Sequence, residues 1–274
     1  MQNSARWGAL ALVLLLPLST FAQKKAKAPK ESEDMEHIRE ELGVNEFTAP
    51  SIDLVFEELG SIGQIPFDKV WRDLPDSPPQ NRAQLALAAG AVIADGFLAV
   101  TAQKQSRIEP VGRVLLKLAK GLGVGEHVTK HSRSILEKAA KQNWEGVKKE
   151  LTRAQADVEA AMLGLKDEEI AHLVALGGWL RGLEMTSTVV CEEYTPERAR
   201  RLIQPELLEY FLDRVETLNP NFKKTTVAQT IETNLKEIKA ITTKQVDAPI
   251  EEAEAKRIRD LVRDINKQIN SGEE

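Results

Sequence analysis

Two long stretches of this chain, Gln84 to Ala102 and Ile170 to Val190, carry apolar or small side chains around most of the circumference that a helix would have. A helix that is apolar on all sides has to be buried, in a protein core or in a membrane. Gln84 and Asp95 interrupt the first stretch, and a carboxylate at mid-membrane costs roughly 2.5–3.5 kcal/mol on insertion scales. We therefore expect both stretches to form the central helices of a folded domain, with a membrane span as the alternative.

Helical periodicity continues along the rest of the chain from residue 80, and no stretch alternates apolar and polar residues as a half-buried strand does. We expect helices over 80–104, 108–121, 125–141, 144–164, 167–190, 196–218, 222–243 and 249–269. The breaks between these helices are short, which favours antiparallel neighbours. The sequence predicts an all-α fold, either an antiparallel helical bundle or a stack of helical hairpins.

Shorter helical pieces precede residue 80. Ser51 can cap a helix over 52–60, and Pro66 can open a further turn. Three prolines within residues 75–79 end that turn, because proline cannot donate the backbone hydrogen bond of a helix. We expect residues 51–274 to form a single all-helical domain.

The two central stretches also resemble each other. Aligning residues 87–97 with 173–183 matches a glycine that follows a charged residue in each segment. The match suggests a duplicated four-helix unit, residues 80–164 and 167–243. Chance similarity between two helices rich in alanine, glycine and leucine is the alternative.

The amino terminus has the three parts of a secretory signal. Arg6 supplies a positive charge, residues 9–18 form an apolar run, and small residues occupy the cleavage positions at 20–22. The run is too short to cross a hydrocarbon core of about 30 Å as a stable helix, so an uncleaved anchor is the less favoured alternative. We expect a signal peptide over 1–22, a flexible charged leader over 23–50, and export to the periplasm or the extracellular space.

Charge is segregated along the chain more strongly than its total of −5 indicates. Residues 104–153 carry a net charge of +7, and residues 154–218 carry −7. Arg113, Lys117 and Lys120 fall on one helical stripe, which is either a patch for an anionic surface or a solvated face. An exported, acidic chain is a poor candidate for binding nucleic acid.

Cofactor and metal motifs are sparse. Cys191 is the only cysteine, which rules out an internal disulfide, a multi-thiolate metal site and attached c-type haem. His127 and His131 are four residues apart, so both would lie on one helix face and could share a metal ion. The spacing supplies no third ligand, and two surface histidines are the alternative. We expect no cofactor.

The most informative polar residues lie within the two apolar stretches. Asp95 and Arg181 have opposite charges and occupy equivalent positions in the suggested repeat, so we expect them to contact each other. Glu184 lies three residues after Arg181, and Trp179 lies seven residues after His172. These five side chains are candidates either for the lining of a ligand cleft or for a buried network that fixes helix register.

Three classes of function are compatible with these features. Long charged amphipathic helices at 143–162 and 222–243 offer faces to partner helices, so an envelope interaction or scaffold protein leads. A periplasmic module that binds a small molecule or a metal is the second hypothesis. An enzyme is the third, because no nucleophile with a paired base is recognisable. The oligomeric state is left open.

Overall fold

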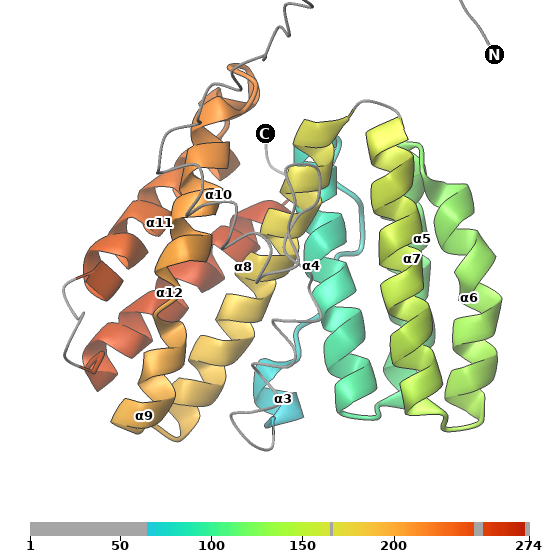
Figure 1. Cartoon of the computed structure of the whole chain (residues 1–274), viewed down its shortest axis with the longest axis horizontal. Helices are drawn as coiled ribbons and strands as arrows, with labels where there is room; N and C mark the ends of the chain where they lie inside the picture. Colours follow the sequence, from blue (N-terminus) through green and yellow to red (C-terminus); the bar gives the residue numbers. More distant parts are fainter. Residues whose placement is uncertain (1–64, 165–166, 244–248, 272–274) are drawn as a thin grey trace, which may run out of the picture.

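The computed structural model describes residues 65–164, 167–243 and 249–271 (Figure 1). Within these residues the chain is helical and contains no strand, which confirms the predicted all-α fold. The predicted signal peptide, charged leader and 52–60 helix lie outside the described residues and stay predictions.

Most of the expected helices are present, with ends that differ by a few residues. In chain order the elements are α3 (Phe67–Val70), α4 (Arg82–Thr101), α5 (Gln105–Leu122), α6 (Gly125–Ala140), α7 (Trp144–Gly164), α8 (Glu168–Glu192), α9 (Pro196–Ala199), the 3-10 helix η1 (Arg200–Leu202), α10 (Pro205–Thr217), the 3-10 helix η2 (Phe222–Lys224), α11 (Thr226–Thr243) and α12 (Glu252–Asn270). The short turns between consecutive helices reverse the chain direction, as the sequence predicts (Figure 1).

The expectation of one continuous helix over 196–218 is wrong, because the chain divides there into α9, η1 and α10. Pro205 is the cause: proline disfavours the helical conformation at the residue before it. Gln204 has φ −131° and ψ 64°, and Pro205 then occupies the first turn of α10, where its missing N–H is harmless. The expected 222–243 helix is also divided, at Thr225, which is extended with ψ 151°.

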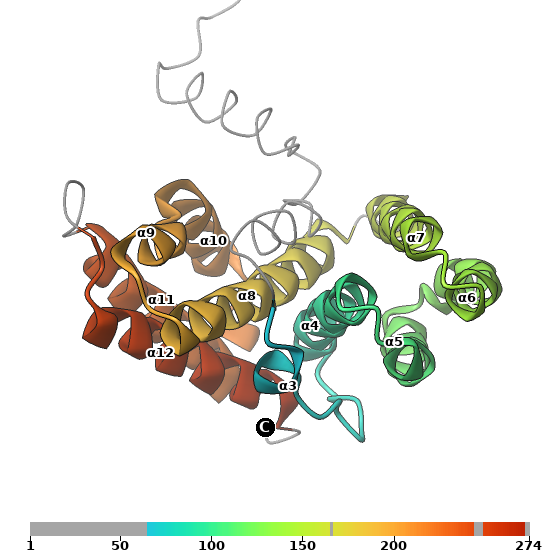
Figure 2. The same cartoon turned by 90° about the horizontal axis from the view of Figure 1, so that it is seen from below.

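Helices α4 and α8 lie side by side in the middle of the molecule (Figure 2). Helices α5, α6 and α7 cover the α4 side, and α9 to α12 cover the α8 side. The ion pair between Arg82 Nη2 and Asp167 Oδ2, 2.5 Å apart, joins the starts of α4 and α8, and Asp95 contacts Arg181 further along both helices. The central pair therefore runs parallel, although consecutive helices are antiparallel. The duplicated unit stays a prediction.

The α4 and α8 backbones approach closely because glycines lie at the crossing. A Cβ atom on Gly90 would lie 1.8 Å from the carbonyl oxygen of Val174, and one on Gly177 would lie 2.0 Å from that of Leu87. Helix α4 is long and apolar enough to span a membrane, but 94% of its most apolar window is buried inside the fold. Helix α4 is therefore buried as a core helix is. This agrees with the expectation from Asp95, whose charge disfavours a membrane span.

Replacing Gly90 by alanine should lower the free energy of unfolding by about 1–3 kcal/mol, because a methyl group in a packed contact forces the backbones apart. Gly112 of α5 is the matched control, since a Cβ there meets nothing within 4 Å. Gly112→Ala should raise stability by about 0.5–1 kcal/mol, as expected for an exposed helical position. Urea unfolding measures both values, and equal effects would contradict the close contact.

Candidate functional site

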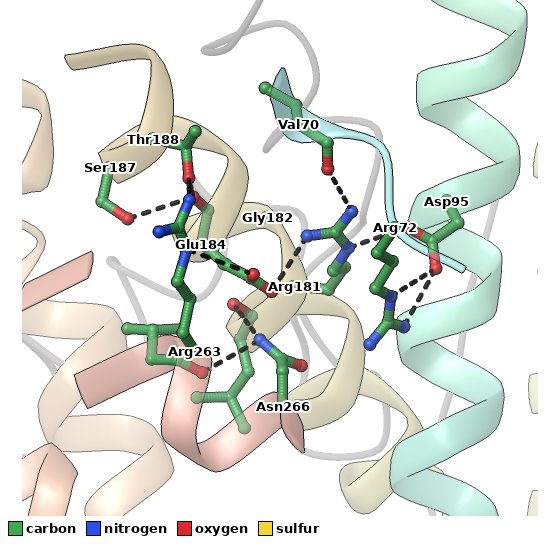
Figure 3. A network of polar contacts seen from close by, with 12 residues as sticks. Val70, Arg72, Asp95, Arg181, Gly182, Glu184, Ser187, Thr188, Arg263 and Asn266 are labelled. Carbon is green, nitrogen blue, oxygen red and sulfur yellow. Dashed lines mark hydrogen bonds and ion pairs between the residues drawn. The ribbon is translucent and has the colours of Figure 1, made fainter. Parts of the chain in front are cut away.

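A cluster of five charged residues lies in and beside the contact between α4 and α8 (Figure 3). Its members are Arg72 after α3, Asp95 on α4, Arg181 and Glu184 on α8, and Arg263 on α12. We call this group the charge cluster. It combines residues from four separate parts of the chain, so it exists only in the folded state.

Asp95 is the centre of the charge cluster, and its side chain is fully buried. Arg181 Nε donates a hydrogen bond of 2.7 Å to Asp95 Oδ1, which confirms the contact expected between these two residues. Arg72 Nε donates to the other oxygen, Oδ2, at 2.9 Å. Two arginines on one buried carboxylate supply the partners that burial of a charge requires.

Arg181 is 1% exposed and is held on three sides. Besides Asp95, its Nη2 donates to the carbonyl oxygen of Val70 at 2.7 Å, and its Nη1 lies 2.9 Å from Glu184 Oε2. Burial opposes the charged guanidinium, but the carboxylates of Asp95 and Glu184 outweigh it and raise the pKa of Arg181. Arg181 therefore stays a cation in the core.

Glu184 continues the charge cluster toward α12. Arg263 Nε lies 3.8 Å from Glu184 Oε1, and Arg263 Nη2 donates to Thr188 Oγ1 at 3.3 Å (Figure 3). Asn266, one turn further along α12, donates to the carbonyl oxygen of Leu180 at 3.3 Å. These contacts join α8 to α12. Because all five charged members have a partner of opposite sign and the two central ones are buried, the geometry is that of a network that fixes the helices.

Trp179 and His172 lie apart from the charge cluster. Residues 179 and 181 point roughly 200° apart around α8, so they face different neighbours. Trp179 stacks on Phe211 of α10, with ring centroids 4.9 Å apart, and its Nε1 donates to Gln204. His172 lies 3.0 Å from the hydroxyl of Tyr210, also on α10. The structure thus brings together Asp95, Arg181 and Glu184, while Trp179 and His172 belong to the α8–α10 contact.

The two candidate metal ligands on α6, His127 and His131, lie in different environments. His127 is exposed, whereas His131 is 6% exposed, so the alternative of two surface histidines is wrong for His131. Its Nδ1 lies 2.7 Å from Glu150 Oε1 and its Nε2 lies 3.0 Å from Asp157 Oδ2, both on α7. One carboxylate of α7 thus lies at each ring nitrogen of His131.

The two carboxylates around His131 are strongly acidic. Hydrogen bonds from His131 and then Lys138 lower the pKa of Glu150 to about 2. Hydrogen bonds from Lys130 and then His131 lower the pKa of Asp157 to about 2. This second polar network joins α6 to α7. The one sequence signal for it is the spacing of residues 150 and 157, which are seven apart and therefore share one face of α7.

No group of three potential ligand side chains among the described residues is placed to hold a metal ion. Ser134 Oγ lies 2.5 Å from Lys138 Nζ, a pair that can form a nucleophile and its base. Lys138 is also ion-paired with Glu150, and Ser134 donates to the same carboxylate at 3.1 Å. An ion-paired ammonium cannot accept the serine proton, so this arrangement joins α6 to α7.

The basic stripe of α5, defined as Arg113, Lys117 and Lys120, is exposed as the sequence predicts. Arg113 Nη1 lies 3.9 Å from Glu109 Oε1, which is a weak surface pair. Within the described part of the chain, Lys117 and Lys120 make no ion pair. Two free ammonium groups thus lie one turn apart on the outer face of this helix.

A cleft of about 870 Å³ lies where α3, the α4–α5 turn and the end of α8 meet. Ile65, Phe67 and Val189 give it apolar walls, and most of its charged groups already have neighbours. Lys69 pairs with Glu192, Arg198 pairs with Glu193, and Lys104 lies 5.1 Å from the Phe67 ring centre. Sequence reasoning missed this cleft because its walls come from three distant segments.

Cys191 lies at the end of α8 and is half-buried. Burial raises the pKa of its thiol, so the thiolate is disfavoured there. This environment is that of a packed apolar side chain.

Comparison of the chain with protein-family models, with curated proteins and with solved structures finds no match.

A double-mutant cycle tests the charge cluster. Asp95→Asn and Arg181→Met should each cost about 3–5 kcal/mol of unfolding free energy, because each change leaves a buried partner without its charge. The double variant should cost less than the sum of the two. The exposed pair Lys236 and Glu232 is the control, with a coupling of about 0.5 kcal/mol or less. Additive effects in the buried pair would contradict a shared network.

Acid should weaken the α6–α7 contact. Because the folded-state pKa values of Glu150 and Asp157 lie near 2, below their usual 4.5 and 3.8, the stability that they supply is present above pH 4.5. That stability is lost as the pH falls toward 2. Urea unfolding across this range should show a smaller pH dependence for Glu150→Gln/Asp157→Asn than for the unchanged chain. Glu145→Gln, an exposed change on the same helix, should keep the original dependence, and an unaltered slope in the double variant would contradict the assignment.

Proposed function

We propose that this chain is an exported helical scaffold protein that binds an anionic protein or envelope component through the basic stripe of α5. The single observation that carries the proposal is that the buried charged residues have partners within the chain, whereas two exposed lysines have none in its described part. The charge cluster is closed by residues of the chain itself, whereas Lys117 and Lys120 are exposed and have no ion-pair partner among the described residues. A free cationic stripe on a rigid helix is the kind of surface that an anionic partner recognises.

Two further features support an exposed binding surface. Residues 104–153 carry a net charge of +7, so the field around α5 attracts anions beyond its own three cations. The three-part signal at the amino terminus directs such a chain to an envelope, where anionic lipids and polymers are abundant.

Binding of a small molecule is the second candidate function. The observation in its favour is the cleft of about 870 Å³ at the ends of α4 and α8, a volume typical of ligand sites. Its charged groups are largely paired with one another, which is why we rank this function below the scaffold.

Charge reversal tests the scaffold. Lys117→Glu/Lys120→Glu should weaken partner binding by about 2 kcal/mol or more, on the order of thirtyfold, because each cation near an anionic surface contributes about 1 kcal/mol. The control is Lys141→Glu/Lys149→Glu, which makes the same change of net charge on exposed lysines outside the stripe.

The measurement is native mass spectrometry of each protein purified from its own envelope. A macromolecular partner retained by the unchanged chain and by the control, and lost from the stripe variant, is the expected result. Retention of a small molecule by all three proteins would favour the second candidate, and equal loss in both variants would contradict a specific stripe.

A further inference from the structure

The segment before the described residues has a charge opposite to that of α5. Residues 31–58 contain ten acidic residues and a single basic one, Arg39. Residues 104–153, which include α5 and its basic stripe, carry +7. The two segments therefore have net charges of opposite sign.

The described part of the chain begins close to the start of α5. Ile65 and Lys104, the residue before α5, line the same cleft. Phe67 lies under Lys104, and Trp71 lies under Arg107 of α5, with the guanidinium carbon 5.1 Å from the ring centre. Ile65, the first described residue, thus lies near the amino-terminal end of α5.

The chain is long enough to reach the whole stripe. Lys120 lies 16 residues after Lys104, a distance of about 24 Å along the helix. Glu46 lies 19 residues before Ile65, and 19 residues span about 28 Å even at the helical rise of about 1.5 Å per residue. The carboxylates before Glu46 have still more chain available.

We propose that the acidic segment 31–58 of the same molecule docks on the basic stripe of α5. The occupant is identified by charge complementarity and by chain connection, since a tethered segment has an effective concentration near the millimolar range. Docking places its carboxylates against Lys117 and Lys120, two neighbouring cations on one helix face that have no ion pair among the described residues. This inference rests on the proposed function in one respect: an external anionic partner has to displace the segment, which makes the segment an intramolecular inhibitor.

Zero-length carbodiimide cross-linking of the purified, full secreted chain tests the docking, with mass spectrometry to locate the links. Lys117 and Lys120 should form amide links to carboxylates of residues 31–58 in several-fold higher yield than Lys149 and Lys224, which are exposed elsewhere. The yield should fall by about threefold or more between 0.1 and 1 M salt, because the screening length shrinks from about 10 to 3 Å.

A charge swap supplies the matched control. Lys117→Glu/Lys120→Glu should abolish these links, and adding Glu57→Lys/Glu58→Lys in the same chain should restore links between the two segments with the reacting groups exchanged. Failure of the swap to restore them, when circular dichroism shows an intact helical fold, would overturn the proposal.

Cross-linking a mixture of isotopically labelled and unlabelled protein distinguishes links within one molecule from links between two molecules. Links within one molecule support the proposal, whereas links only between labelled and unlabelled chains show a second copy as the occupant and overturn it. Equal yields at Lys149 or Lys224, or no links at Lys117 and Lys120, also overturn it. The proposed function is judged separately by the envelope partner, so either idea can fail while the other stands.

Discussion

The contact between the α4 and α8 backbones at Gly90 and Gly177 determines what the middle of this fold can contain. Because neither residue has a side chain, the helices approach until a Cβ would lie within about 2 Å of a carbonyl oxygen. At that separation little room remains for water between them. A charge further along the same contact, such as Asp95, is buried and needs partners within the fold. Arg181 on the facing helix is one partner, and Arg72 is the other.

The charge cluster supplies the partners that this buried contact requires, and its contacts extend from α4 and α8 to α12. Arg181 uses its three nitrogens on three different parts of the chain, and Glu184 passes the interaction to Arg263 on α12. Arginine suits this role better than lysine, since its planar fork donates in several fixed directions at once. The interior is thereby specified by directional contacts as well as by apolar packing.

The sequence predicted the features that depend on local pattern. Helix positions, the burial of α4 and the contact of Asp95 with Arg181 follow from periodicity and from opposite charges in apolar helices. Pro205 also predicts a helix break, because proline disfavours the helical conformation at the residue before it. The helical periodicity over 196–218 nevertheless suggested one continuous helix. By contrast, the partners of His131 and the role of Arg72 depend on how distant segments pack. A single sequence does not show which distant segments pack together, so neither the partners of His131 nor the role of Arg72 was predicted.

The surface cations of α6 and α5 differ in how they are paired. On α6, nearby carboxylates pair with Lys130, Arg133 and Lys138, so the repulsion among these cations is relieved within the fold. On α5, the pair of Arg113 with Glu109 is long and exposed, and the two lysines of the stripe have no such neighbour in the described chain. Like charges on one helix face repel, and an anion that binds there gains the attraction of all three cations. The repulsion between Lys117 and Lys120 is therefore not relieved by any ion pair among the described residues, in contrast to that on α6.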